Sequence, residues 1–286
     1  MTAIDAAVPA PGPTRTSAPL GRVLLAELRW VLRRPRNLLA LLMLAGLPVL
    51  LGTAIALTGG PGGRGGDSVL AAVAGNGLVL PVAALVLAQT LLLPLVVAMV
   101  AADALAGESA HGTLRGLLLA PVGRVRLVGV KAFGVLVLAV LAVTVLAVSG
   151  VLTGLIIVGG DGLVTLSGTT LPIGSALGRV ALAAGWSAVQ MAAIGMIALA
   201  ISSLTEHPLV VMAATVGGLI IFGVLGTIPA LDWLQPVLIT TDWSAVMDVL
   251  RDPISSDSLM TGLLRAGCYL LIGLSAAITR MVTKDA

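Results

Sequence analysis

Residues Gly107–Lys131 read GESAHGTLRGLLLAPVGRVRLVGVK and separate two long apolar runs, 78–102 and 132–158. Only 10% of the residues in this chain are charged, yet this stretch gathers acidic, basic and imidazole side chains together. Each flanking run is long enough to cross the hydrocarbon core of a bilayer as a helix, which takes about 20 residues. We therefore predict a polar loop between two membrane spans.

The first half of this loop has the spacing of a short helix. Glu108, His111 and Arg115 lie three and four residues apart, so a helix places them on one face. Pro121 ends such a helix, because its ring clashes with the preceding turn and it has no N–H to donate. The opposite side of the helix carries apolar residues, namely Leu114, Leu117 and Leu118. A helix with these two faces is suited to lie against a partner protein.

The composition places the whole chain in the membrane. Of its 286 residues, 58% are hydrophobic, and the mean hydropathy is +1.12. A soluble domain is about 45–50% apolar and about 25% charged. The net charge of +3 comes from basic residues near the ends of apolar runs, and with 2% aromatic residues the chain lacks a surface on which bases could stack. We expect an all-α integral membrane protein that binds no nucleic acid.

Six apolar runs predict six transmembrane helices. At 1.5 Å per residue, the first run is about 31 Å long, which matches the hydrocarbon core. The predicted spans are 38–58, 78–102, 132–158, 180–203, 209–230 and 263–282. Residues 1–19 are rich in Pro, Ala, Thr and Ser, which predicts a disordered tail. Residues 20–286 are then one transmembrane domain.

The loop also resembles a known family through a sequence of residues in fixed order, Glu108-x3-Gly112-Thr113-Leu114-Arg115-x2-Leu118-x2-Pro121-Val122-x-Arg124-x2-Leu127-x3-Lys131. This order, between the second and third spans, is similar to the first cytoplasmic loop of type-2 ABC exporter permeases. These are the six-helix membrane subunits of bacterial ATP-driven exporters. The resemblance implies a coupling helix that docks on an ATP-binding subunit through Glu108, His111, Gly112, Thr113, Leu114 and Arg115. It also implies two permease subunits, identical or homologous, and two copies of the ATP-binding cassette subunit, which bind the ATP and Mg.

Residues 20–36 predict an amphipathic helix ahead of the first span, similar to the elbow helix of that family. At about 100° per residue, four arginines fall within roughly 60° of arc, namely Arg22, Arg29, Arg33 and Arg36. Such a helix lies in the interface plane of the lipid membrane, with its arginines toward anionic headgroups. Glu27 and Arg34 fall on the apolar side. They either contact the partner ATPase or form a snorkelling pair.

Lysines and arginines predict the orientation. With the N-terminus inside, all but four of the 16 basic residues lie on inner segments, the exceptions being Arg64, Arg179, Arg251 and Arg265. Basic residues accumulate on the cytoplasmic side of membrane proteins. We expect a multi-pass protein of the bacterial cytoplasmic membrane, with both termini and the loop after the second span in the cytoplasm.

The sequence lacks patterns for catalysis and for metal binding. Neither lysine, Lys131 or Lys284, follows a glycine as in G-x4-G-K-[ST], so there is no P-loop. The histidines, His111 and His207, have no carboxylate or cysteine at metal-ligand spacing from both, and the serine-nucleophile motifs are missing. The spans carry no ionisable residue near their middles, which disfavours an ion-coupled carrier. We expect no catalytic residue, no metal site and no cofactor bound by this chain, with ATP hydrolysed by a separate subunit.

Few polar side chains lie within the predicted spans. Gln89 and Gln190 are candidates to line a substrate path, because amides are unfavourable in lipid. The alternative is that each forms a hydrogen bond between helices. A path so poor in charge favours a hydrophobic or amphiphilic substrate, and the resembling family commonly carries drugs, antibiotics, lipids or peptides.

We expect the permease subunit of an ABC exporter, of the multidrug- or antibiotic-export type, that moves its substrate out of the cytoplasm or inner leaflet. Three alternatives stay open. A haem- or cytochrome-assembly export subunit has a similar first loop, although the outer segment 231–262 is long for it. A non-transporting scaffold or regulator would not co-purify with a nucleotide-binding subunit in fixed ratio. An intramembrane enzyme would need catalytic residues that the sequence does not offer.

Overall fold

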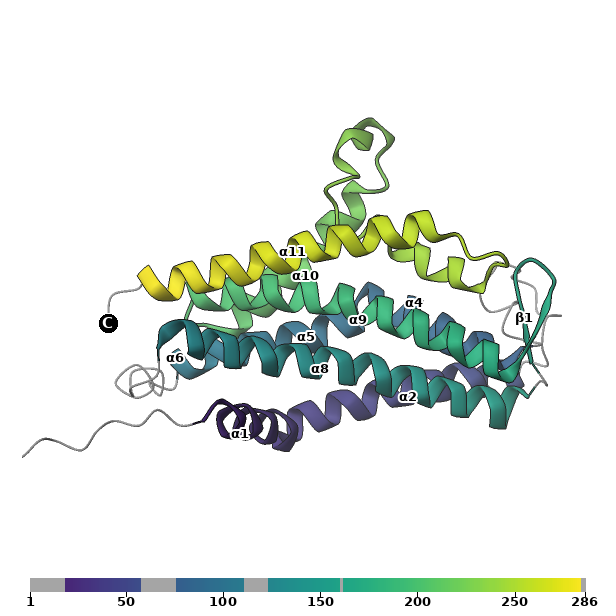
Figure 1. Ribbon diagram of the computed structural model, residues 1–286, viewed down its shortest axis with the longest axis horizontal. Helices are drawn as coiled ribbons and strands as arrows, with labels where there is room; N and C mark the ends of the chain where they lie inside the picture. The colour runs from purple at the N-terminus through teal and green to yellow at the C-terminus, as the bar shows by residue number, and fades with distance from the viewer. Residues whose placement is uncertain (1–18, 58–75, 111–122, 160–161, 284–286) are drawn as a thin grey trace, which may run out of the picture.

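The computed structural model describes residues 19–57, 76–110, 123–159 and 162–283, and it forms an elongated helical bundle (Figure 1). Six helical segments among these residues are long and apolar enough to cross a membrane: Pro35–Leu57, Leu92–Ala110, Arg124–Val158, Ile173–Leu204, Pro208–Leu225 and Ser256–Thr283. The predicted all-α membrane fold with six transmembrane helices is confirmed.

One helix, α9 (Ile173–Leu204), lies at the centre of the bundle. It packs against three others, namely α5 (Leu92–Ala102), α8 (Arg124–Thr153, continued by the π-helical turn η3, Gly154–Val158) and α11 (Ser256–Thr283). A methyl group at Gly273 of α11 would lie only 2.6 Å from the backbone of Met196 on α9. Small residues let helix backbones approach closely in a membrane, where dispersion contacts must replace the hydrophobic effect. Gly273 therefore permits the tight α9–α11 pairing.

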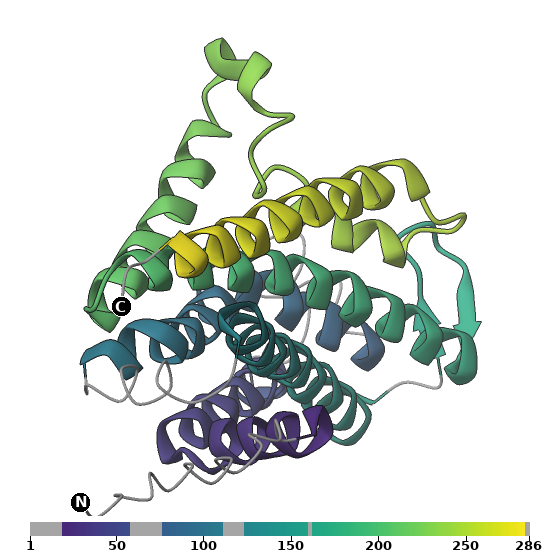
Figure 2. The same ribbon diagram turned by 60° about the vertical axis from the view of Figure 1, so that its left-hand side comes forward.

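Two helices lie at the edges of the bundle, α2 (Pro35–Leu57) and α10 (Pro208–Leu225). Only 11% of the apolar window of α10 is buried, the smallest share of the six spans. After α10 the chain leaves the bundle through η4 (Pro229–Leu234), which stands apart in both views (Figures 1 and 2). It returns to α11, where the Tyr269 hydroxyl donates to the Val237 carbonyl at 2.8 Å.

The second predicted span is not one continuous helix. A 3₁₀ turn, η1 (Gly77–Val79), leads into α4 (Leu80–Thr90), and α5 begins at Leu92. Leu91 between them has φ −146° and ψ −48°, outside the helical region. Pro94 explains the break, because it has no N–H for the Thr90 carbonyl and its ring clashes with that carbonyl. The apolar run 78–102 predicts one span and does not reveal this break.

Three helices begin earlier in the chain than the apolar runs suggest. α8 begins at Arg124 rather than at 132, α9 at Ile173 rather than 180, and α11 at Ser256 rather than 263. Arg179 and Arg265, counted as outer-loop residues, therefore lie inside α9 and α11. Arg265 is more than two turns from the start of its helix. Arg265 still lies near the start of the predicted span 263–282, because the helix extends beyond that span at its N-terminal end.

The end of the bundle opposite α1 is covered by short elements. Two strands, β1 (Gly162–Val164) and β2 (Thr170–Pro172), form an antiparallel hairpin. The 3₁₀ helix η5 (Trp243–Leu250) packs against α4, α9 and α11. The Leu166 amide donates to the Leu250 carbonyl at 2.9 Å, which joins the hairpin to η5. Of the long segment predicted at 231–262, η5 is thus folded onto the ends of the spans, whereas η4 stands apart from the bundle (Figures 1 and 2).

Candidate coupling site

The N-terminal helix α1 (Leu20–Arg33) lies crosswise to the long helices at one end of the bundle (Figures 1 and 2). A residue before proline is pushed out of the helical region, and Arg34, before Pro35, has φ −69° and ψ 121°. The chain therefore bends sharply before α2 begins at Pro35. The Asn37 side-chain amide donates to the Val31 carbonyl at 2.8 Å across this bend. The crosswise position of α1 follows from this local geometry.

Lys131 on α8 is the centre of a buried ionic cluster beside α1. Its ammonium donates to both carboxylate oxygens of Glu27 on α1, at 3.0 and 3.1 Å. It also pairs with Glu108, the first residue of α6 (Glu108–Ala110). The side chain of Lys131 is only 5% exposed. One ammonium thus joins three elements that are distant in the sequence, and we call Glu27, Trp30, Glu108 and Lys131 the Lys131 cluster.

The electrostatics of this cluster are unusual because two carboxylates share one lysine. Burial raises the pKa of the Glu27 carboxyl above its ordinary value, and the nearby Glu108 charge acts in the same direction. Lys131 and Arg34 act in the opposite direction. The Trp30 ring adds cation–π contacts, with the Lys131 ammonium 4.7 Å and the Arg34 guanidinium 3.6 Å from its centroid. Lys131 and Arg34 therefore each contact the Trp30 ring in addition to their carboxylate partners.

A second cluster ties the α1–α2 bend to the end of the second span. Asp103 begins η2 (Asp103–Gly107), a π-helical turn between α5 and α6. Its Oδ2 accepts from the Arg34 and Arg36 guanidinium groups, each at 2.6 Å. Asp103 is 8% exposed, so its charge needs such partners. We call Arg34, Arg36 and Asp103 the Asp103 cluster.

The two clusters bind α1 to the helices on both sides of the loop that follows α6. The Asp103 cluster holds the helix that enters this loop, and Lys131 lies two turns inside the helix that leaves it. Between α1 and α8 a cavity of about 270 Å³ remains, lined by Val23, Ala26, Glu27, Trp30, Glu108, Leu127, Val130 and Lys131. Ion pairs therefore join α1 to the described helices on both sides of this loop.

The comparison with known families fits this architecture. The family model of the ABC-2 family transporter proteins matches residues 32–205, which is more than half of the chain. The chain belongs to this family. It is therefore a permease subunit, the membrane component of an ABC transporter that acts with an ATP-binding subunit. The comparison with curated proteins finds no significant match to the chain.

The structure of this ABC-2 permease places only part of the predicted coupling residues. Glu108 lies in the Lys131 cluster, whereas His111, Gly112, Thr113, Leu114 and Arg115 lie outside the described residues. The Glu108 side chain is 11% exposed and faces Lys131. Its direct contact with an ATPase surface stays a prediction, and the structure shows a contact within the chain instead.

On α1, the arginines and Glu27 have different surroundings. Arg22, Arg29 and Arg33 are exposed, and Arg36 pairs with Asp103. Glu27 and Arg34 do not form a pair of their own, because Glu27 binds Lys131 and Arg34 binds Asp103. The Glu27 side chain is 11% exposed, which leaves little of it for a partner protein.

Three residues of the clusters were not recognised as functional in the sequence. In the sequence Lys131 enters only the pattern that resembles the permease family and the count of inner basic residues, and the predicted site residues do not include Trp30 or Asp103. Asp103 gave a usable signal, because a carboxylate directly after an apolar run of membrane length needs a partner. The sequence could not identify that partner, because Arg34 and Arg36 are more than 60 residues away.

The two glutamines of the permease connect helices. Gln89 Oε1 accepts from the Ser187 hydroxyl at 3.1 Å, which joins α4 to α9. Gln190 Nε2 donates to the Gly262 carbonyl at 3.0 Å, which joins α9 to α11. Both glutamines are 1% exposed. The geometry favours the helix–helix interpretation, although Gln89 Nε2 has no acceptor among the described residues.

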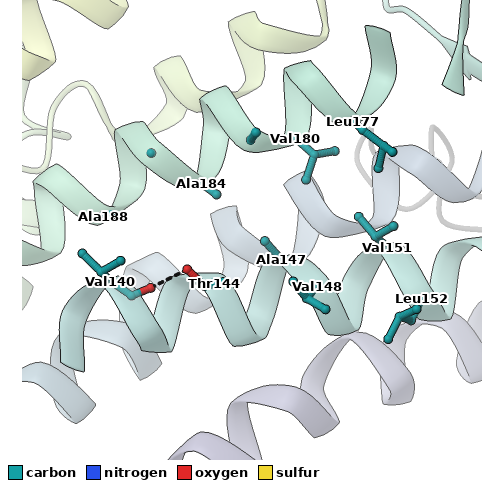
Figure 3. A pocket seen from close by; sticks show the side chains of 12 residues that line it. Val140, Thr144, Ala147, Val148, Val151, Leu152, Leu177, Val180, Ala184 and Ala188 are labelled. Atoms are coloured by element: carbon teal, nitrogen blue, oxygen red, sulfur yellow. Dashed lines mark hydrogen bonds between the residues drawn. The ribbon is translucent and has the colours of Figure 1, made fainter. Parts of the chain in front are cut away.

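A lateral apolar groove lies between α8 and α9 (Figure 3). Its volume is about 430 Å³, and it is lined by residues of both helices, among them Val140, Ala147, Val151, Leu177, Val180 and Ala184. The hydroxyl of Thr144 in its wall donates to the Val140 carbonyl at 2.8 Å. The groove wall is therefore almost wholly apolar.

Proposed function

We propose that this permease exports a hydrophobic or amphiphilic substrate, driven by ATP that a separate ATP-binding subunit hydrolyses with Mg. In this proposal the α1 end of the bundle faces the bacterial cytoplasm. The ATP-binding subunit pushes on residues 108–120, which we call the coupling segment. The movement passes through the Lys131 cluster to α1 and α8 and opens a path toward the outside.

The Lys131 cluster carries this proposal. The coupling segment begins at Glu108, and Glu108 is bound through Lys131 to both α8 and α1. A buried ion pair adds little net stability compared with apolar packing of the same volume, but it fixes the relative position of the groups that it joins. A network of this kind at the start of the coupling segment suits the transmission of a movement.

The groove between α8 and α9 supports an apolar substrate. Its single hydroxyl is satisfied within its own helix, so the wall offers almost nothing to a polar ligand. Polar groups placed there would lose their hydrogen bonds to water without replacement. An alkyl or aromatic group suits such a wall.

The low burial of α10 supports a second permease subunit. Its apolar surface includes Val210, Ile220, Ile221 and Val224, each at least half exposed. Lipid can cover such a face, and so can the same face of another copy. We propose two permeases, identical or homologous, with two ATP-binding subunits.

Purification from the native membrane tests the proposal. We expect an ATP-binding cassette protein in fixed ratio with the permease, and faster ATP hydrolysis by that protein in the complex than alone. Glu108→Arg places a second cation against Lys131 and should abolish this stimulation while the complex still forms. The exchange Glu108→Lys with Lys131→Glu restores one of the two ion pairs and should recover part of it. Full stimulation in Glu108→Arg would contradict the coupling role.

A further inference from the structure

The crosswise helix α1 has three distinct sides. Glu27, Trp30 and Arg34, spaced by three and four residues, face the bundle through the two ionic clusters. Leu25, Leu28 and Leu32 have the same spacing on a second side, where Leu25 is 49% exposed. The third side carries Arg22, Arg29 and Arg33, which are seven and four residues apart and all exposed. We call these three arginines the basic face of α1.

The basic face differs from the other arginines of this region. Arg34 and Arg36 are neutralised by Asp103. Within residues 19–57, 76–110, 123–159 and 162–283, no carboxylate forms an ion pair with Arg22, Arg29 or Arg33. The fold therefore uses two arginines internally and leaves three cations, beside an apolar strip, on the surface of a helix that lies across the spans.

We infer that the basic face of α1 binds the phosphate groups of anionic phospholipids in the adjacent leaflet. Arginine forms paired hydrogen bonds with phosphate oxygens, and its guanidinium is easier to desolvate than an ammonium. A helix with an apolar strip next to a basic strip settles at the headgroup level, where both strips are satisfied. The charge of the face and its place beside Leu25 favour a lipid over a soluble anion.

Lipid binding at this face also regulates coupling, a consequence that rests on the proposed function. The bundle side of α1 holds Lys131 through Glu27, and Lys131 holds Glu108 at the start of the coupling segment. Headgroups that fix α1 in the interface therefore fix the position of Glu108. The permease should stimulate its ATP-binding subunit more strongly in a membrane that contains anionic lipid.

The test uses the full-length permease in phosphatidylcholine vesicles with traces of spin-labelled phosphatidylglycerol or spin-labelled phosphatidylcholine. The wild type should prefer the anionic probe, and the preference should weaken in high salt. Replacing all three arginines by glutamine should reduce the preference for the anionic probe, by up to roughly fivefold for each charge removed. The matched variant with three lysines should keep most of the preference. Arg280→Gln removes a lone exposed arginine at the same end of the bundle and should change it least.

The outcomes distinguish anionic lipid from the ATP-binding subunit as the partner of the basic face. An unchanged lipid preference in the triple glutamine variant overturns the inference. Loss of the co-purified ATP-binding subunit, with the lipid preference intact, would assign the basic face to that subunit instead and leave the proposed function standing. If the preference falls as expected but no ATP-binding subunit accompanies the wild type, the lipid site stands and the proposed function fails.

Discussion

Both ends of this bundle contain ion pairs, but the pairs at the two ends connect different parts of the protein. At the β-hairpin end, Arg179 binds the Asp252 carboxylate at 3.2 Å and the Val249 carbonyl at 2.9 Å, and Arg265 binds Asp242 and the Leu238 carbonyl, each at 2.9 Å. These arginines fasten loop backbone onto a span. At the α1 end, the pairs connect side chains of separate helices. The first arrangement stabilises a cover, whereas the second is the one through which we propose that helix movement passes.

The largest expected effect is that of Lys131→Met at the α1 end. It leaves the Glu27 and Glu108 carboxylates buried without their shared cation, which should destabilise the permease by about 3–5 kcal/mol. Thermal unfolding in detergent measures this loss. Lys131→Arg keeps the charge and should recover much of the stability. An unchanged unfolding temperature in Lys131→Met would show that the cluster is not formed.

Arg265→Met at the opposite end should have a smaller effect. Hydrogen bonds to charged groups contribute about 1.5–3 kcal/mol, and this change removes the links from α11 to Asp242 and Leu238. Limited proteolysis should cut the segment before η5 more readily. Stimulation of the ATP-binding subunit, corrected for the amount of folded complex, should stay normal. A selective loss of stimulation would remove the proposed difference between the two ends.

Gln89 lies between the two ends of the bundle. Gln89→Leu is therefore a reference variant against which the changes at both ends can be compared. It removes the acceptor of the Ser187 hydroxyl, a helix–helix hydrogen bond that contributes about 0.6 kcal/mol in membranes. We expect a small decrease in stability and no change in the lipid preference of α1. A large loss of transport with normal stability would instead assign Gln89 to the substrate path.

Glu27→Gln should change the pH dependence of stability rather than its overall level. Burial raises the pKa of Glu27, so the folded protein binds this proton at a higher pH than the unfolded chain does. Glu27 therefore contributes stability below its ordinary pKa, and this contribution is lost as the pH rises through the raised pKa. The other charges that act on it are Lys131, Glu108 and Arg34. As the pH rises from the ordinary to the raised pKa of Glu27, the wild type should lose stability relative to Glu27→Gln, as measured by unfolding at each pH. A difference in stability that stays the same at every pH would contradict the raised pKa.

The sequence predicts the fold better than the site. Apolar runs of membrane length fix the number of spans, because a bilayer demands about 20 residues in each. They do not fix where helices begin, since α8 and α11 continue through charged residues that have partners inside the protein. Pro94 shows the same limit, because its effect on the second span depends on whether neighbouring helices tolerate the break.

The order of residues around Glu108 predicts the coupling residues. This order locates the loop in the sequence but does not reveal which residues the loop contacts. The sequence places Lys131 at the far end of the same loop as Glu108, but the bond of Lys131 to Glu27 depends on the crosswise position of α1. That position follows from the bend at Pro35 and from the two arginines on Asp103, a long-range pairing that periodicity does not reveal. The division of α1 into a bundle side, an apolar side and a basic face depends on the neighbours of the helix, which the sequence does not identify.

The central claim is that movement enters at Glu108 and passes through Lys131. A double-mutant cycle with Glu108→Gln and Lys131→Met tests it most directly, with stimulation of ATP hydrolysis by the companion subunit as the readout. If the two residues act as one link, the double variant should be no worse than Lys131→Met alone. Effects that simply add, or normal stimulation in both single variants, would contradict the account.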